Sequence, residues 1–237
     1  MKKLVTLAIL PFMISCNGQK NSLVTSIAEA PLQLENFDFN TKLSTLLPEK
    51  TKSKEYHGYY QLKSEMMEVD TISDGAFVGS EKPIRIEYKQ QSFSSRDILA
   101  KFGNEKFNAV NLVTTMDGKI MLVNALIGET DVAKTKRFVE TLDKKYGVGV
   151  KSKGEFIDQS FDIYTWTLKD RIIRYSLVID NEANTLKIEV DEENKKIMNG
   201  EKKAHYKGYI YVVKSEYKDQ IFGEVGSGDF VFLENRR

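Results

Sequence analysis

The sequence has a single cysteine, Cys16, so the chain cannot form a disulfide within itself. Its two histidines, His57 and His205, leave a zinc site of nitrogen and sulfur ligands almost nothing to use. No serine has glycine at both flanking second positions, so the nucleophile elbow of one large hydrolase class is missing. The glycines also lack the spacing of phosphate-binding or dinucleotide-binding loops. We therefore expect no metal site, no cofactor and no recognisable catalytic residue.

The chain also lacks an excess of charge of one sign, because 35 lysines and arginines stand against 34 aspartates and glutamates. Phosphate backbones bind to concentrated basic faces, so this composition argues against a nucleic-acid partner. Both signs are interspersed along the sequence, which is typical of a solvated globular surface. After the N-terminal segment, no apolar run approaches membrane-spanning length.

The N-terminal segment carries the clearest pattern in the chain. Lys2 and Lys3 precede an apolar run over residues 4–14, and the small residue Ser15 stands directly before Cys16. The run is too short to span a bilayer as a mature helix. This arrangement resembles the signal peptide and lipobox of bacterial lipoproteins. The resemblance implies cleavage after residue 15 and acylation of Cys16, which would anchor the protein to a membrane through two or three acyl chains.

The residues that follow the cysteine bear on location. In one bacterial sorting system an aspartate directly after the acylated cysteine retains lipoproteins at the inner membrane, whereas Asn17 stands there in this chain. No acidic residue precedes Glu29, so the acidic signal that sends some lipoproteins to the cell surface is missing. We therefore expect a protein of the outer membrane that faces the periplasm. Residues 16–33 are expected to be the lipidated cysteine and a flexible tether.

Residues 34–237 are expected to form one α+β domain, a mostly antiparallel sheet of hairpins and a meander with two or three packed helices. Two small subdomains with a boundary near residue 150 are an alternative. The firmest local prediction is a hairpin at Asp117-Gly118, because this dipeptide readily adopts positive φ. One helix is predicted over residues 94–103. A second is predicted over residues 130–147, with Thr130 as its N-cap and Gly147 at its end. Residues 32–48 fit either a strand or a helix.

Strands elsewhere are predicted from alternating apolar and polar residues. A short echo between residues 87–93 and 216–222 is either a repeat or a chance recurrence of common strand residues. The predicted strands cover residues 56–63, 84–88, 107–115, 119–127, 206–213 and 230–233, with a meander over 161–168, 172–179 and 185–190.

Aromatic residues supply the only candidate binding residues. Tyr164 and Trp166 share one face of their strand, and Tyr209 and Tyr211 share one face of theirs, because side chains alternate across a strand. If these faces are open, they form an aromatic surface for a protein partner or a sugar ring. Cross-strand packing inside a sheet is the alternative.

These observations favour a non-catalytic, lipid-anchored binding protein of the bacterial envelope with an unknown protein or glycan partner, such as an immunity protein that neutralises a toxin. One alternative is an envelope hydrolase that acts on glycan or peptide through carboxylates with His57 or His205, which needs a histidine within hydrogen-bond reach of an acid. Another is a structural subunit of an envelope assembly, which needs a large exposed apolar patch.

Overall fold

The computed structural model describes residues 25–74, 82–157, 159–180, 188–191, 196–199 and 205–234. The predicted signal peptide and Cys16 lie outside these residues. Within the described ranges, no helix is both long enough and apolar enough to cross a membrane.

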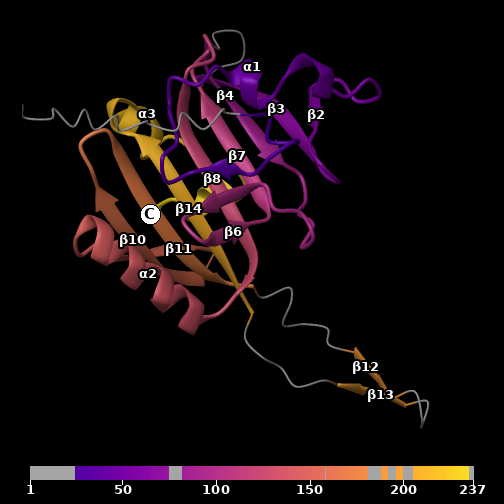
Figure 1. Ribbon diagram of the computed structural model, residues 1–237, viewed down its shortest axis with the longest axis vertical. Helices are drawn as coiled ribbons and strands as arrows, with labels where there is room; N and C mark the ends of the chain where they lie inside the picture. Colours follow the sequence, from indigo (N-terminus) through magenta and orange to yellow (C-terminus); the bar gives the residue numbers. More distant parts are fainter. Residues whose placement is uncertain are drawn as a thin grey trace, which may run out of the picture.

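A nine-stranded antiparallel sheet is the centre of the molecule (Figure 1). The edge strand β2 has only three residues, whereas β9 at the other edge pairs with β10 along its whole length. In spatial order the strands are β2 (Tyr59–Gln61), β3 (Met66–Asp74), β4 (Lys82–Gln90), β7 (Ala109–Thr114), β8 (Ile120–Thr130), β14 (Tyr206–Lys214), β11 (Arg171–Ile179), β10 (Gln159–Thr167) and β9 (Val150–Phe156).

Smaller elements surround this sheet. Three short strands form a second sheet, and a two-stranded ribbon lies in the connection between β11 and β14. The second sheet contains β1 (Leu32–Gln33), β5 (Ala100–Phe102) and β6 (Glu105–Phe107), and the ribbon contains β12 (Ile188–Asp191) and β13 (Lys196–Asn199). The helices are α1 (Leu43–Leu46), α2 (Val132–Tyr146) and α3 (Lys218–Ile221), with 3-10 turns η1 (Glu49–Thr51), η2 (Ser215–Tyr217) and η3 (Gly228–Phe232).

The predicted α+β class is wrong, because 46% of the structure is strand and the helices are few and short. The helix expected over 94–103 does not form. Ala100–Phe102 is instead β5, which pairs with β1 on one side and β6 on the other. A helix of this length is marginal in isolation, whereas both neighbouring strands offer hydrogen-bond partners. Residues 230–233, expected as a strand, belong mostly to η3.

The two strongest local predictions are confirmed. Strands β7 and β8 form a hairpin, and Gly118 between them has φ of 79°. Helix α2 ends at Gly147, whose φ is 86°. Its N-cap is Asp131 rather than Thr130, because the Asp131 side chain accepts a hydrogen bond from the Lys134 amide. Residues 32–48 contain both a strand, β1, and a helix, α1.

The predicted meander is only partly correct. Strands β10 and β11 pair as expected, but the strand next to β11 is β14, and β12 pairs with β13 in the separate ribbon. The echoed segments also differ in structure, since residues 87–90 end β4 whereas 216–221 form η2 and α3. This difference favours chance recurrence over a repeat.

Part of the expected tether packs against the domain. Ile27 is fully buried, and its amide donates to the Leu46 carbonyl at 3.1 Å. Leu32 begins β1, which pairs with β5 in parallel. The described part of residues 16–33 therefore belongs to the folded domain rather than to a flexible linker.

Each face of the large sheet has its own core. Helix α2 and the N-terminal segment cover one face (Figure 1). There Phe138 of α2 packs edge-on against Tyr175 of β11, with ring centroids 5.1 Å apart. The opposite face is covered by residues 215–234, which we call the C-terminal segment. Ile221, Val225 and Phe230 of this segment are fully buried.

Polar side chains on the second face hold the C-terminal segment in place. We call Glu87, Asn111, Asn124, Tyr211 and Ser176 the polar row, because cross-strand register places them on one face of five neighbouring strands. All five residues are almost completely buried. Such groups destabilise a fold unless they are hydrogen-bonded, and the C-terminal segment supplies many of their partners.

The hydrogen bonds follow the segment across the sheet from β4 to β11. Asn124 supports the row from within, since it accepts from Asn111 at 2.7 Å and donates to the Ile210 carbonyl at 3.0 Å. The polar row bonds to the segment through Ser227 Oγ to Glu87 Oε2 (2.6 Å), Asn111 Nδ2 to Asp229 Oδ2 (2.9 Å), Tyr211 OH to the Asp229 carbonyl (2.6 Å) and Ser176 Oγ to the Phe232 carbonyl (2.7 Å). Basic side chains of the sheet add Arg85 Nη2 to the Glu224 carbonyl (3.0 Å), Lys89 Nζ to Ser227 Oγ (3.3 Å) and Arg174 Nη1 to the Leu233 carbonyl (3.0 Å).

Ile157 in the β9–β10 turn has a backbone φ of 45°, a conformation that β-branched residues rarely adopt. Its side chain is 80% exposed. Asparagine tolerates this conformation better, so the first prediction is that Ile157→Asn should stabilise the fold by about 1 kcal/mol. Urea denaturation measures the change. Val148→Asn is the control, because Val148 is 90% exposed without positive φ. Equal effects of the two substitutions would contradict the explanation.

The second prediction concerns Asp229, whose pKa is raised by burial although the hydrogen bond from Asn111 opposes the shift. The folded protein therefore binds the proton more tightly than the unfolded chain, and stability falls as pH rises through the folded pKa. Asp229→Asn should be more stable than the wild type at neutral pH and lose this advantage near about pH 4. Urea denaturation at both pH values tests this, and a less stable variant at neutral pH would contradict it.

Candidate functional site

The four aromatic residues singled out from the sequence lie on opposite faces of the large sheet. Tyr164 pairs with Tyr175 on the α2 side, whereas Tyr209 and Tyr211 pair with Ser176 and Arg174 under the C-terminal segment. Trp166, Tyr209 and Tyr211 are only 2%, 3% and 0% exposed. They do not form an exposed aromatic surface, because both faces of the sheet are covered.

Most of these side chains have structural partners. The Trp166 indole donates to Asp143 Oδ1 of α2 at 2.9 Å, and the Tyr211 hydroxyl donates to the Asp229 carbonyl. Tyr164 stacks on Trp166 with an interplanar angle of 19°. Cross-strand and interlayer packing, the alternative stated above, therefore describes Tyr164, Trp166 and Tyr211.

The two histidines are far apart in the sheet. His57 is exposed beside the edge strand β2, and His205 precedes the central strand β14. The nearest carboxylate to His205 is Glu129, with Nδ1 and Oε1 3.8 Å apart, which is beyond hydrogen-bond reach. No three acidic, histidine or cysteine side chains form a metal site within the described ranges. The geometry that the hydrolase alternative needs is not formed by these residues.

The edge strand β9 bears on the structural-subunit alternative. Val148, Val150 and Ile157 are exposed at this edge. Lys151 and Lys153 lie between them and pair with Asp162 of β10. Lysines on an edge strand oppose pairing with another sheet, so this edge is not a continuous apolar surface.

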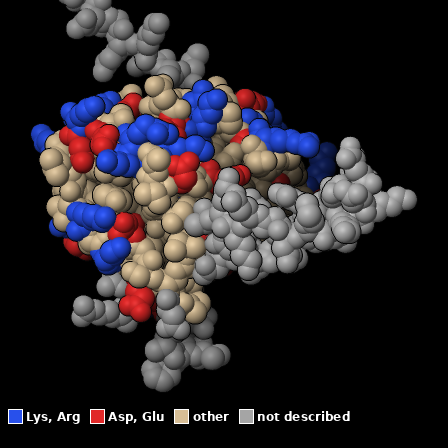
Figure 2. All heavy atoms as spheres, turned by 90° about the horizontal axis from the view of Figure 1, so that it is seen from below, with Lys and Arg blue, Asp and Glu red and all other residues tan. Residues whose placement is uncertain are grey.

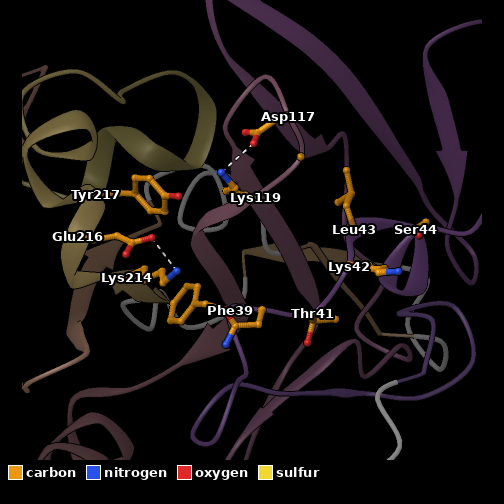
Figure 3. A pocket seen from close by; sticks show the side chains of 12 residues that line it. Phe39, Thr41, Lys42, Leu43, Ser44, Asp117, Lys119, Lys214, Glu216 and Tyr217 are labelled. Carbon is orange, nitrogen blue, oxygen red and sulfur yellow. Dashed lines mark ion pairs between the residues drawn. The ribbon is translucent and has the colours of Figure 1, made fainter.

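An open groove of about 620 Å³ lies at one end of the sheet (Figure 3). Three segments that are distant in the sequence form it, because the β7–β8 turn, the end of β14 and the chain before α1 meet there. We call it the lysine groove. Its lining residues are 39–44, 117–119, Lys214, Glu216 and Tyr217.

Five charged side chains line the lysine groove. Asp117 pairs with Lys119 at 2.9 Å, and Glu216 pairs with Lys214 at 2.7 Å. Lys42 is exposed and forms no ion pair with the described residues. The groove therefore has three cations against two anions, and the surplus positive charge is at Lys42.

Hydrogen bonds keep these groups ionised. The Thr115 hydroxyl donates to Asp117 Oδ1 at 2.5 Å, and together with Lys119 it holds the pKa of Asp117 below its usual range. The hydrogen bond from Lys214 lowers the pKa of Glu216 in the same way. The Asp117 carboxylate raises the pKa of Lys119. Asp117, Lys119 and Glu216 are therefore charged at neutral pH.

Two aromatic rings complete the walls. The Lys214 ammonium lies 5.5 Å from the Tyr217 ring centroid, and the Arg171 guanidinium lies 5.6 Å from that of Phe39. These cation–π contacts hold the rings in place. In Figure 3, Tyr217 and Glu216 lie on one side of the groove and Lys42 and Leu43 on the other.

The sequence reading did not identify the lysine groove. The Asp117-Gly118 turn was recognised, but only as a hairpin signal. Lys42 and Lys214 carry no local pattern that distinguishes them from the other lysines of the chain. Their convergence is set by sheet topology.

The third prediction concerns the pKa of Asp117. Thr115→Val removes the hydroxyl that contributes most to lowering it, so the pKa should rise toward the ordinary aspartate value. Lys119→Met removes both the hydrogen bond and the positive charge of the ammonium group, so it should raise the pKa of Asp117 as well. Carbon-detected NMR titration of the carboxyl group measures both shifts, and an unchanged pKa in Thr115→Val would contradict the assignment.

The lysine groove offers charge and hydrogen-bond donors in a setting that stays open to water. Asp117, Lys119 and Glu216 have side chains 62%, 66% and 55% exposed. This arrangement suits the binding of a polar partner rather than chemistry that needs water to be excluded. No protein-family model, curated protein or solved structure matches the chain.

Proposed function

We propose that the protein is a non-catalytic, lipid-anchored binding protein of the bacterial envelope, and that its lysine groove takes an acidic, extended segment of a protein partner. The observation that carries this proposal is the convergence of Lys42, Lys119 and Lys214 from three separate parts of the chain on one open groove.

The charge arrangement supports an acidic partner. Lys119 and Lys214 already have carboxylate partners, whereas Lys42 has none among the described residues. A partner carboxylate can therefore pair with Lys42 without breaking an existing ion pair. Exposed pairs contribute only about 0.2–1 kcal/mol each, so charge would act mainly on partner choice and association rate. On the face drawn in Figure 2, blue and red residues are interspersed.

The openness of the groove supports an extended polypeptide over a small molecule. Small-molecule sites enclose about 70–90% of the ligand surface, whereas the side chains of Asp117, Lys119 and Glu216 are more than half exposed. An extended segment can lie along the groove and leave its outer side in water. The backbone of such a segment can also hydrogen-bond to the hydroxyl and carboxylate groups of the rim.

The proposed location at a membrane surface comes from the resemblance of the N-terminal segment to the signal peptide and lipobox of bacterial lipoproteins. Ile27, which is buried in the domain, lies only eleven residues after Cys16. Fully extended, that length of chain reaches at most about 38 Å. An acylated Cys16 would therefore keep the lysine groove close to the membrane, and the partner would be met there.

Cys16→Ala should abolish membrane fractionation and labelling with a clickable fatty acid, and a variant that stays membrane-bound and labelled would contradict the anchor.

Site-specific crosslinking tests the binding role. A photo-crosslinking residue at position 42 of the acylated chain should capture a partner in cells, and peptide mapping should place the crosslink in an acidic segment. The same residue at position 136 is the control, because Lys136 is 77% exposed on α2, away from the groove.

Charge reversal then separates specific from incidental contact. Lys42→Glu should weaken binding of the identified partner by about fivefold, whereas Lys136→Glu should leave it unchanged. High salt should weaken the wild-type complex. Identical crosslinks from both positions, or a partner segment without acidic residues, would contradict the proposal.

A further inference from the structure

A second cavity lies on the C-terminal-segment side of the sheet and shares no residue with the lysine groove. Its volume is about 280 Å³. Lys207 and Tyr209 of β14 line it, and Lys214 of the lysine groove is seven residues further along the same strand, or about 23 Å away. The two sites are therefore separate.

Tyr209 is the first unusual feature of this cavity. The residue is only 3% exposed, yet its hydroxyl makes no hydrogen bond with the described residues. The neighbouring Tyr211 hydroxyl, by contrast, donates to the Asp229 carbonyl, whereas Tyr209 lines the cavity. Burial raises the pKa of Tyr209 well above its usual value, so the hydroxyl keeps its proton. It is a hydrogen-bond donor without an acceptor among the described residues.

Asp229 is the second feature. Its Oδ2 accepts a hydrogen bond from Asn111, whereas Oδ1 has no hydrogen bond with the described residues. The side chain also lines the cavity. The polar row and the C-terminal segment hold this carboxyl in place, so its second oxygen is an acceptor that is positioned but not used. Donor and acceptor therefore line the same small space.

One part of the cavity wall is apolar, beside the polar residues that line the rest. The Phe93 ring packs on Gly128, where a Cβ would lie only 2.0 Å from the ring. Ala109 and Leu126 complete the apolar lining. Gln90 holds the loop before Phe93, since its side chain donates to the Ser92 carbonyl at 2.6 Å and accepts from the Val110 amide at 3.1 Å. A ligand would meet a preformed site.

The charges around the cavity disfavour an ionic ligand. Lys207 lies 5.8 Å from the Phe93 ring centroid and pairs with Asp180 at 3.3 Å. An ion of either sign would therefore meet a like charge as well as an opposite one. A neutral hydroxyl group avoids this repulsion, and it can accept from Tyr209 and donate to Asp229.

We infer that this cavity binds a neutral sugar ring, with hydroxyl groups on Tyr209 and Asp229 and an apolar ring face against Phe93. A cavity of about 280 Å³ is large enough for one sugar ring but too small for several linked rings. The site is independent of the partner proposed for the lysine groove.

Ligand-observed NMR tests the inference on the full acylated chain in a detergent without a sugar headgroup. The probes are glucose and N-acetylglucosamine, with glucosamine and glucuronic acid as charged comparisons. At least one neutral probe should bind at least about tenfold more tightly than either charged probe. Absence of saturable binding by both neutral probes would overturn the inference.

Substitutions locate the binding. Tyr209→Phe removes a hydroxyl without an internal partner, so it should weaken sugar binding by about tenfold and leave the melting temperature unchanged. Asp229→Asn replaces the unused acceptor by an amide donor and should weaken binding as well. Tyr164→Phe is the matched control, because that side chain is on the opposite face of the sheet. Sugar binding that survives both Tyr209→Phe and Asp229→Asn would overturn the inference.

Discussion

The hydrogen bonds between the polar row and the C-terminal segment are the constraint on which the rest of the structure depends. Five polar residues in the middle of a sheet would destabilise it if their partners were lost. The segment in turn has only short helical turns and needs side chains from the sheet to satisfy its carbonyl groups. The polar row and the C-terminal segment therefore each need the other to satisfy their buried hydrogen-bonding groups.

Both candidate sites inherit their geometry from this contact. The segment begins at the end of β14, where Glu216 and Tyr217 form one wall of the lysine groove. It later brings Asp229 to the second cavity, opposite Tyr209. The packing of the C-terminal segment on the sheet thus positions both the Asp229 carboxyl group and the Glu216–Tyr217 wall of the lysine groove, although the two sites are far apart.

Sequence reasoning succeeded where the signal was local. The Asp117-Gly118 hairpin and the helix ended by Gly147 depend on backbone preferences of a few neighbouring residues. It failed where tertiary pairing decided the outcome, as when residues 100–102 became a strand between β1 and β6. Alternation predicted that Tyr209 and Tyr211 share a face, but could not predict what covers that face. The lysine groove could not be predicted from the sequence, because Lys42 and Lys214 are brought together only by the topology of the sheet.

Native-state hydrogen exchange tests the central claim most directly. The amides of Val225, Phe230 and Leu233 donate hydrogen bonds within the C-terminal segment, to the carbonyls of Ile221, Ser227 and Phe230. If the segment is part of the cooperative core, these amides should exchange only through global unfolding, with the same protection as β8 and β14. Protection much lower than that of these strands, and insensitive to denaturant, would show that the segment detaches on its own and would contradict the account.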